Sequence, residues 1–455
     1  MSVLMLAGTG LFAGSLDYLS NQSARWVMST SRNAATDAAD AVLFNPAGTA
    51  FLSEGFHVDL SGQTLFKFYR NEDVQSTGWT VGAATFPTTK ESLKQDYPTP
   101  ILPNLFLVYN FGAVGPGKLA AYLQAGIVAG GGELKWKDGT AGTTFLLNGM
   151  GAKIAAAGGG TYVNGGIKSQ EFTASSIYYG TGIGASYAFL DDMVSFSLGG
   201  RMVMAQRSFE LEAAYATGAG ASVKYEYDAK GFTPIIGVNV KPTKELTLAA
   251  RFEAQTALEF KYKQKKLDGS LNTYAGAALT SAGIVDGKKT RQDLPPIVGL
   301  GAQYKVNDQL TLDLSGTIYM LSLANMGHVY DDGAQVGKTN KYFGTGWEVA
   351  LGATYKVLEQ LKVGGGVMYT ESGAKKKYLN DTKTIFNASA NPSLDSITIG
   401  LGATYAIMDN LDFTLSAMWA HYFPENFSVS SPPVAVSGKY SKDVIDIAYG
   451  VGYKF

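Results

Sequence analysis

The sequence predicts an all-β protein: a 14-stranded antiparallel transmembrane β-barrel with a small N-terminal plug inside its lumen. Three observations lead to this prediction. From residue 170 onward, one strand–turn–strand pattern recurs to the end of the chain. The strands of this pattern alternate apolar with polar or small residues over about ten positions. Short and long connections alternate between the strands, which is how outer-membrane barrels connect their strands.

The repeated unit is a β-hairpin. Clear copies occupy residues 295–321, 346–372 and 396–422, and looser copies occupy 180–206 and 233–255. In each copy a tight turn carrying Asp, Asn, Glu, Lys or Pro separates two strands, which is typical of hairpins.

The last strand shows the alternation most clearly. One face of residues 445–455 carries Ile445, Ile447, Tyr449, Val451, Tyr453 and Phe455. The other face carries Asp446, Ala448, Gly450, Gly452 and Lys454. Alternation with a period of two places one face of the strand in an apolar medium and the other against polar or small groups.

A soluble β-sandwich also alternates, with its apolar face turned inward. However, the expected strands are about 10–15 residues long, whereas strands of globular sheets are usually about 5–6. Tyrosines recur at one level, just before a short turn or the chain end: Tyr187, Tyr304, Tyr355, Tyr405 and Tyr453. Trp347 and Trp419 lie near the opposite ends of their strands. Aromatic residues at two levels resemble the interfacial girdles of a membrane barrel, which favours the barrel.

An even number of strands suits a closed antiparallel barrel. The fourteen expected strands span 53–70, 98–111, 117–135, 170–189, 193–212, 224–240, 245–264, 294–306, 309–323, 345–357, 361–374, 394–407, 411–423 and 442–455. The short turns, expected to form the periplasmic rim, lie near 112–116, 190–192, 241–244, 307–308, 358–360 and 408–410. The long connections, expected to be extracellular, are 71–97, 136–169, 213–223, 265–293, 324–344, 375–393 and 424–441.

Composition excludes several classes of protein and site. The net charge is −1, so no nucleic-acid partner is expected. The absence of cysteine removes disulfides, thiolate metal sites and cysteine nucleophiles. No apolar run reaches 18 residues, so no transmembrane helix is expected. Residues 1–14 are interpreted as the remnant of a signal peptide that lacks its basic start, and they predict export.

Residues 15–52 lack the alternation and precede the barrel, which is expected to span 53–455. Fewer than 40 residues cannot bury a core of their own, so this segment is predicted to lie inside the barrel as a plug. The run AATDAADAVLF (34–44) suggests a short helix with Asn33 or Thr36 as its N-cap. Pro46 then interrupts regular structure and biases Asn45 toward an extended conformation.

The tripeptide Asn45-Pro46-Ala47, the run SRNAATDAAD before it (31–40) and a fourteen-stranded barrel that ends in Phe455 resemble the FadL family of outer-membrane transporters for hydrophobic compounds. The resemblance covers essentially the whole chain in architecture. It implies transport of long-chain fatty acids or aromatic hydrocarbons. It also implies a plug that meets an inward kink of the third strand, and release of the substrate sideways into the membrane.

The expected third strand (117–136) contains Gly130, Gly131 and Gly132 at its centre. Glycine inside a strand marks a bulge, a bend or a close backbone approach. A kink frees backbone groups that need partners, and the amide of Asn45 offers both donors and an acceptor. We therefore expect Asn45, with Pro46 and Ala47, to act as a plug latch that caps this kink. Alternatively, the triplet is only a crowded glycine-rich strand, like residues 364–366.

The alternation predicts which charged side chains face the lumen. They are Arg201, Arg207, Arg251, Glu253, Glu348 and Asp446. Arg201 or Arg251 could hold the carboxylate of a substrate through a bidentate contact. The favoured alternative is that these arginines pair with the lumen carboxylates and hold the barrel interior or the plug.

Two of the long extracellular connections are unusually apolar. Capture candidates are Phe145 and Leu147 in the connection 136–169, and Leu271, Tyr274 and Leu279 in the connection 265–293. Exposed apolar loops usually mark a binding surface. The alternative is a lid in which these loops fold over each other without contacting a ligand.

The rival functions are an enzyme and a general diffusion porin. His57, His328 and His421 fall at the rims or on the lipid face, so no nucleophile–base pair emerges and no enzyme is expected. Asp37 and Asp40 are interpreted as solvated or helix-dipole partners rather than metal ligands, and neither a metal nor a cofactor is expected. A porin would lack the plug.

The expected partners are a hydrophobic small molecule, outer-membrane lipid, and the barrel assembly machinery through the terminal Phe455. The protein is expected to be a monomer in the bacterial outer membrane. The sequence does not separate a fatty acid from an aromatic hydrocarbon as the substrate.

Overall fold

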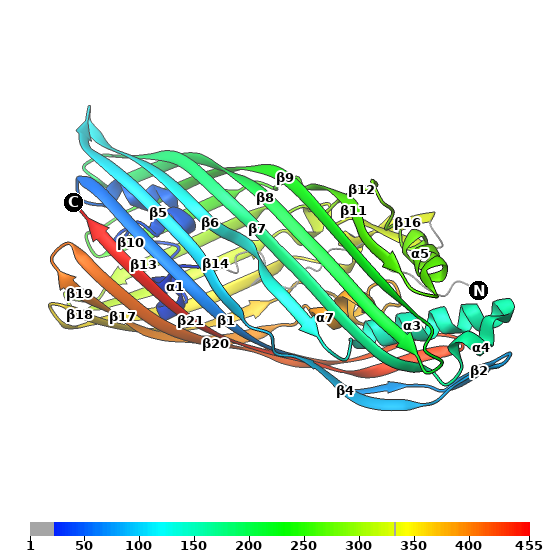
Figure 1. Ribbon diagram of the computed structural model, residues 1–455. Helices are drawn as coiled ribbons and strands as arrows, with labels where there is room; N and C mark the ends of the chain where they lie inside the picture. Colours follow the sequence, from blue (N-terminus) through cyan, green and yellow to red (C-terminus); the bar gives the residue numbers. More distant parts are fainter. Residues whose placement is uncertain (1–21, 332–333) are drawn as a thin grey trace.

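The computed structural model describes residues 22–331 and 334–455. Within these ranges, one antiparallel sheet closes into a barrel of fourteen wall strands, because the first strand pairs with the last (Figure 1). The predicted fold class and number of strands are therefore confirmed. The predicted signal-peptide remnant, residues 1–14, lies outside the described ranges.

Most wall strands lie close to their predicted positions, but the predicted long connections 213–223 and 424–441 are wrong, because the strands continue and leave only 216–219 and 432–433 between them. The wall strands are β1 (Gly55–Ser76), β5 (Thr99–Val114), β6 (Gly117–Trp136), β7 (Ile167–Phe189), β8 (Val194–Tyr215), β9 (Gly220–Val240), β10 (Leu246–Glu253) continued by β11 (Glu259–Asp268), β12 (Lys289–Arg291) continued by β13 (Ile297–Lys305), β14 (Leu310–Tyr319), β17 (Gly346–Leu358), β18 (Leu361–Glu371), β19 (Ser396–Met408), β20 (Leu411–Ser431) and β21 (Val434–Lys454). The predicted strand 245–264 is thus built from two pieces, and the next wall strand begins with β12, inside the predicted connection 265–293.

Several strands are much longer than a membrane is thick. Strand β7 has 23 residues and β8 has 22. At a rise of about 3.3 Å per residue, such a strand exceeds the hydrocarbon core of about 30 Å even when it is tilted by about 45°. These strands therefore continue beyond the membrane at the end of the barrel that carries the long connections.

The outer surface of the barrel is apolar, and the alternation explains why. On β8, Leu198, Met202 and Met204 are exposed, whereas Arg201 and Val203 between them are buried in the lumen. The same alternation recurs on the other strands, as a lipid-facing wall requires. Among the described residues, no helix is long and apolar enough to cross a membrane.

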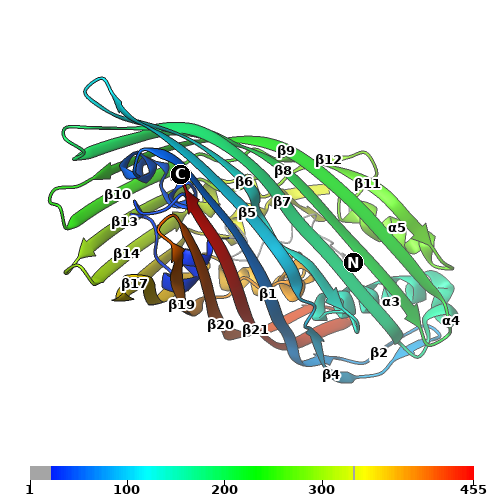
Figure 2. The same cartoon turned by 60° about the vertical axis from the view of Figure 1, so that its left-hand side comes forward.

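The N-terminal segment, residues 22–52, lies inside the end of the barrel that carries the short hairpins (Figures 1 and 2). It contains α1 (Ala24–Ser29), α2 (Ala41–Phe44) and the 3₁₀ helix η2 (Pro46–Phe51), and we call it the plug. Helix α1 packs against β17 to β21 and η2 against β5 to β9. The plug is therefore enclosed by wall strands from both halves of the chain.

The predicted helix over 34–44 is wrong for most of its length, because only Ala41–Phe44 is helical. Neither Asn33 nor Thr36 caps it, since Asp40 is the N-cap residue. The amide of Asn33 instead donates hydrogen bonds to the carbonyls of Leu300 and Gly316 on the wall. A lumen lined with backbone and polar groups offers the plug such partners, so local helix propensity does not decide its structure.

The opposite, extracellular end of the barrel carries the long connections (right-hand side of Figure 1). Its helices are α3 (Ala141–Ile154) continued by η3 (Ala155–Gly159) and α4 (Gly160–Val163), α5 (Asn272–Ser281), α6 (Lys376–Leu379), α7 (Ile385–Ala390), η4 (Leu321–Leu323) and η5 (Thr339–Tyr342). Short strands accompany them: β2 (Trp79–Val81), β3 (Ala84–Phe86), β4 (Thr89–Gln95), β15 (His328–Asp331) and β16 (Ala334–Lys338). We call helices α3 to α7 the cap.

Candidate functional site

The central region of β6 is bent inward. Its register with β7 shifts twice, between Ile127 and Ala129 and between Ala129 and Gly132. Gly130 and Gly132 have φ angles of 87° and 75°, a left-handed conformation that residues with a Cβ rarely adopt. This irregularity lies at the glycine triplet where the sequence predicts a kink.

The exposure of paired side chains on β6, β7 and β8 gives the direction of the bend. Ile127 pairs with Tyr179 on β7, which pairs with Met204 on β8. Tyr179 is 41% exposed and Met204 is 44% exposed on the lipid side, but Ile127 is only 6% exposed. The backbone of β6 has therefore left the plane of the wall and turned into the lumen.

The bend interrupts the wall. Among the described residues, the ladder between β5 and β6 extends no further than the pair Asn104–Gly126. Residues 99–103 of β5 keep only the pairing with β1 on their other edge. A region without ladder pairing therefore separates residues 99–103 of β5 from residues 127–133 of β6, and we call it the wall gap. It opens at the level of lipid-facing Met204, which is apolar.

Side chains bridge the wall gap. The ammonium of Lys67, on β1, donates to the carbonyls of Gly131 and Glu133 at 2.8 and 2.6 Å. The hydroxyl of Thr99 donates to the carbonyl of Gly131 at 2.8 Å. Thr99 lies on β5 at the edge of the gap, and Lys67 lies on β1, the neighbour of β5. Neither residue is among those predicted from the sequence. The available signal was the lone lysine at a lumen-facing position of the first strand.

The predicted contact between Asn45 and Gly130–Gly132 is wrong. The amide of Asn45 donates to the carbonyl of Val238 at 3.0 Å, to the side chain of Asn239 at 2.6 Å and to the carbonyl of Ala250 at 3.3 Å. These partners lie on β9 and β10. The reason is geometric, because η2 spreads over β5 to β9 and its N-cap residue, Asn45, lies at the junction of β9 with β10.

Asn45, Pro46 and Ala47 nevertheless fix the plug to the wall. Pro46 begins η2, and the side chain of Asn45 caps it by accepting a hydrogen bond from the backbone N–H of Ala47 at 3.2 Å. The hydroxyl of Ser195 donates to the carbonyl of Ala47 at 2.7 Å. A Cβ at position 237 would lie 2.1 Å from Oδ1 of Asn45, so Gly237 is what permits this close approach.

The lumen arginines pair with a carboxylate rather than facing an open cavity. Arg201 and Arg251 both form ion pairs with Glu253, and all three side chains are buried. Arg251 also donates to the carbonyl of Leu43 in the plug. This arrangement matches the alternative favoured by the sequence, in which the arginines hold the barrel interior and the plug.

The other predicted lumen residues also have protein partners. The phenol of Tyr319 donates to Glu348 at 2.9 Å. The amide of Gln63 donates to Asp446. Arg207 donates to Gln292 and lies over the ring of Tyr227 at 5.2 Å. Among these, Arg207 borders the apolar upper lumen.

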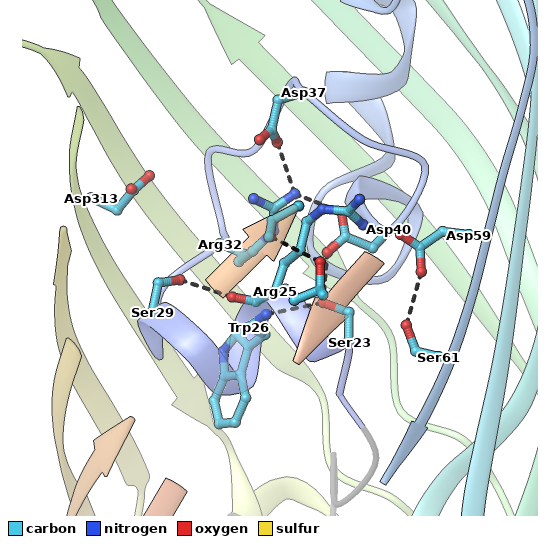
Figure 3. Close-up of polar contacts among 12 residues, drawn as sticks. Ser23, Arg25, Trp26, Ser29, Arg32, Asp37, Asp40, Asp59, Ser61 and Asp313 are labelled. Carbon is cyan, nitrogen blue, oxygen red and sulfur yellow. Dashed lines mark hydrogen bonds and ion pairs between the residues drawn. The ribbon is translucent and has the colours of Figure 1, made fainter. Parts of the chain in front are cut away.

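An ionic network anchors the other side of the plug (Figure 3). Arg25 on α1 forms ion pairs with Asp59 on β1 and Asp412 on β20. Arg32 pairs with Asp37 at 2.8 Å and Asp40 at 2.5 Å. Asp37 and Asp40 are therefore ion-pair partners of Arg32; in addition, Asp37 is half exposed and Asp40 occupies the N-cap position of α2.

The pKa of Asp37 reflects this network. Desolvation by burial raises the pKa, but the charge of Arg32 and its hydrogen bond outweigh that effect. The pKa of Asp37 therefore lies well below its usual range, although half of the side chain is exposed to the neighbouring cavity. This cavity, of about 850 Å³, is lined on the periplasmic side by polar groups that include Arg32, Lys244 and Asp308.

The extracellular capture candidates are mostly buried, contrary to the predicted exposed surface. Phe145, Leu147, Leu271 and Leu279 are buried, and only Tyr274 is exposed, at 38%. The reason is that helices α3 and α5 pack against each other and against the barrel rim. The alternative of a folded lid fits these positions.

The cap encloses a small apolar cavity of about 40 Å³. Its lining residues are Leu146, Leu147, Met150, Phe209, Leu211, Ala213, Tyr215, Ala221, Val223, Ala275, Ala278, Leu279 and Phe386. A space of this size could hold one or two water molecules, but its apolar lining favours a dry cavity. It would have to expand to admit a solute.

One buried apolar cluster joins the cap to the wall gap. It includes Leu279 and Phe145 in the cap, Tyr178 on β7, and Ile127 and Leu102 at the gap. A second, separate cluster lies around the plug. The upper lumen is therefore apolar and the region below it is built from plug and ion pairs.

Comparison with known proteins gives the family. Residues 178–455 match the family described as "Outer membrane protein transport protein (OMPP1/FadL/TodX)". The chain belongs to this family. No curated protein sequence matches the chain. As a FadL/TodX-family protein, it is an outer-membrane transport protein and not an enzyme.

Several solved structures have the same fold as this chain. A FadL homologue of Pseudomonas aeruginosa superposes with a TM-score of 0.68 at 17% identity, covering 96% of this chain and 98% of that one. The P. putida toluene transporter TodX superposes with a TM-score of 0.61 at 13% identity, covering 96% of this chain and 99% of that one. The Ralstonia pickettii toluene transporter TbuX superposes with a TM-score of 0.57 at 15% identity, covering 97% of this chain and 99% of that one.

Proposed function

We propose that this outer-membrane transport protein carries hydrophobic small molecules from the cap through the apolar upper lumen and releases them sideways through the wall gap. The observation that carries the proposal is the single apolar cluster that joins the cap cavity to Ile127 at the gap. Exposing a methylene group to water costs about 0.8 kcal/mol, so a hydrophobic solute gains from a dry route. The relatives named as toluene transporters support the same class of solute.

The plug gives this route its direction. Below the gap, the lumen holds buried plug helices and the ion pairs of Arg25 and Arg32. A hydrophobic solute that entered this region would lose apolar contacts and separate paired charges. Gating by the plug therefore means that the plug keeps the vertical path closed and leaves the wall gap as the exit.

A general diffusion porin is the weaker candidate. Such a channel needs a polar, water-filled lumen, whereas the upper lumen here is lined by the apolar cluster. The residues that could hold the carboxylate of a fatty acid, Arg201 and Arg251, already pair with Glu253. A carboxylate would have to compete with Glu253, which favours a neutral hydrocarbon at this position.

Two further expectations remain predictions. Phe455 is exposed at the end of β21, with its ring centroid 5.0 Å from that of Phe56, and is the expected contact for the barrel assembly machinery. The monomeric state is the second expectation.

The proposal is tested by uptake into vesicles that contain the purified protein. The solutes are radiolabelled toluene, a long-chain fatty acid and a small sugar, each compared with protein-free vesicles. We expect uptake of toluene, the fatty acid or both, and none of the sugar. Uptake of the sugar without either hydrophobic solute would contradict the proposal and favour a porin.

A further inference from the structure

Lys67 is a charged side chain in an apolar place. It lies on the lumen face of β1, is only 1% exposed, and has Leu65 and Tyr69 of the apolar cluster as neighbours on the same face. Burying an ammonium group is costly unless hydrogen bonds replace its water. Its bonds to the carbonyls of Gly131 and Glu133 supply this replacement.

These two carbonyls belong to the bent part of β6. They lie beyond Gly126, where the ladder with β5 ends, and buried backbone carbonyls need other partners. A lysine ammonium has three donors on a long flexible stem. Lys67 therefore reaches from β1 to β6, past the position that β5 occupies lower in the wall.

Two other side chains support this contact. The hydroxyl of Thr99 donates to the same Gly131 carbonyl, from the other edge of the gap. The amide of Gln95 donates to the carbonyl of Lys67 at 3.0 Å and accepts from the backbone N–H of Lys135 at 3.3 Å. Strands β1 and β6 are thus joined across the gap by side chains.

We propose that Lys67 is the residue that closes the wall gap. Its ammonium holds the bent edge of β6 toward β1, and the gap widens when the two carbonyls are released. This positioning role rests on the proposed function in one respect, namely that the gap is the exit for solutes. The closing contact itself is a property of the resting wall.

The chain provides a matched control in Lys442 on β21. This lysine is equally buried, at 1% exposure, and pairs with Tyr69 in the register between β1 and β21. Its ammonium donates to Asn391 at 3.0 Å and lies over the ring of Tyr422 at 4.3 Å. The ammonium also lies over the ring of Tyr69 on β1, at 4.7 Å, so these contacts join β21 to β20, to β1 and to the cap.

The test measures how often the gap opens. The chain has no cysteine, so Val128→Cys places a single buried thiol at the bend. Its rate of reaction with a maleimide is measured in vesicles, with Lys67, Lys67→Met or Lys442→Met in the same background. Loss of two hydrogen bonds from a charged donor is expected to raise the rate about a hundredfold or more in Lys67→Met. In Lys442→Met the rate should change by less than about twofold, because its ammonium donates to Asn391 in the cap, whereas the carbonyls of Gly131 and Glu133 accept from Lys67.

Further variants separate a closing contact from general support of the fold. Lys67→Arg keeps a cationic donor and should return the rate to within about threefold of the parent, since guanidinium groups also bond carbonyls. Thr99→Val removes one neutral hydrogen bond without changing shape and should raise the rate by about threefold to fivefold. This variant keeps the proposal testable if Lys67→Met does not assemble.

Equal rates in the parent and in Lys67→Met would overturn the proposal, as would an equal increase in Lys442→Met or an Arg variant as fast as the Met variant. The failure of the proposed function is distinguishable. If labelling depends on Lys67 but the vesicles take up no hydrophobic solute, the proposed function falls and the closing contact stands. If uptake occurs and labelling is independent of Lys67, only the closing contact falls.

Discussion

The two halves of the lumen differ in chemistry. The extracellular half is filled by the apolar cluster that extends from the cap to Ile127 and Leu102. The periplasmic half is filled by the plug, which is held to the wall by the ion pairs of Arg25, is stabilised internally by those of Arg32, and borders a polar cavity of about 850 Å³. The wall gap lies where these halves meet. The difference teaches that a hydrophobic solute has an apolar path only as far as the gap.

The free-energy cost of moving a hydrophobic solute into the periplasmic half is large. Moving ten methylene groups from an apolar lumen into a polar cavity costs about 8 kcal/mol, at about 0.8 kcal/mol for each group. The lipid side of the wall beside the gap carries the exposed residues Tyr179 and Met204. A step sideways therefore avoids a cost that a step downward incurs.

The largest predicted effect concerns the ionic half. Arg25→Met leaves Asp59 buried without its ion-pair partner, which should weaken plug docking by about 3–5 kcal/mol. We expect ion conductance in planar bilayers to rise sharply while the barrel stays folded. Lys356→Met is the control, because Lys356 pairs with exposed Glu359 at the rim, and such surface pairs contribute about 0–1 kcal/mol. Unchanged conductance in Arg25→Met would break the comparison.

The neutral contacts of the plug should matter less. Asn45→Ala removes the hydrogen bonds to Val238, Asn239 and Ala250, and we expect plug docking to weaken by about 1–3 kcal/mol. Conductance should rise less than in Arg25→Met, and the barrel should still assemble, as judged by heat modifiability on gels. A larger effect than that of Arg25→Met would reverse the order of the two anchors.

The apolar half is tested at the cap cavity. Ala275→Phe adds a ring to a cavity of about 40 Å³ and should strain the cap by about 1–3 kcal/mol. We expect uptake of toluene to fall several-fold, with conductance unchanged. Tyr274→Phe, on the exposed side of the same helix, is the control. Equal uptake by the Ala275 variant would show that solutes bypass the cavity.

Acidity should have the smallest effect. Because the pKa of Asp37 is lowered in the folded protein, its ion pair contributes stability above the usual pKa of about 3.9. This contribution is lost only as the pH falls through the lowered pKa of the folded state. Arg25 and Lys362 also act on Asp37 and lower its pKa further. In an Asp313→Asn background, which removes a second carboxylate from the lining of this cavity, conductance should therefore be the same at pH 8 and pH 5. A rise between these values in that background would contradict the ion-pair assignment.

The strands could be predicted from the sequence because their alternation is local. A lipid-facing residue, such as Leu198 or Met204, and its immediate neighbours in the sequence are enough to predict a strand. The glycine triplet at 130–132 likewise marks the bend, because a positive φ is a property of single residues.

The partners across the lumen could not be predicted in this way. The sequence predicts that Asn45 contacts the bend, but the packing of η2 places it beside β9 and β10. Lys67 contacts Gly131 only because β6 leaves the wall and β5 begins late. The burial of Leu147 and Leu279 depends on how two helices from distant connections pack together. Each of these facts follows from register and packing, which no short stretch of sequence contains.

The central claim is that solutes leave through the wall gap, and a reversible cross-link tests it most directly. A Cβ at position 132 would lie 3.4 Å from that of Thr99, close to the separation of about 3.5–4.5 Å found in disulfides. Thr99→Cys with Gly132→Cys would therefore tie the two edges of the gap together, despite a cost of about 1–2 kcal/mol for the left-handed backbone at 132. Thr404→Cys with Thr414→Cys is the matched control, since these hydroxyls lie 2.9 Å apart on regularly paired strands.

Uptake of toluene into vesicles is measured for both double variants, oxidised and then reduced. We predict that the oxidised 99–132 cross-link stops uptake and that reduction restores it, while the 404–414 cross-link has no effect in either state. Uptake that continues unchanged through the oxidised 99–132 variant would contradict release through the wall.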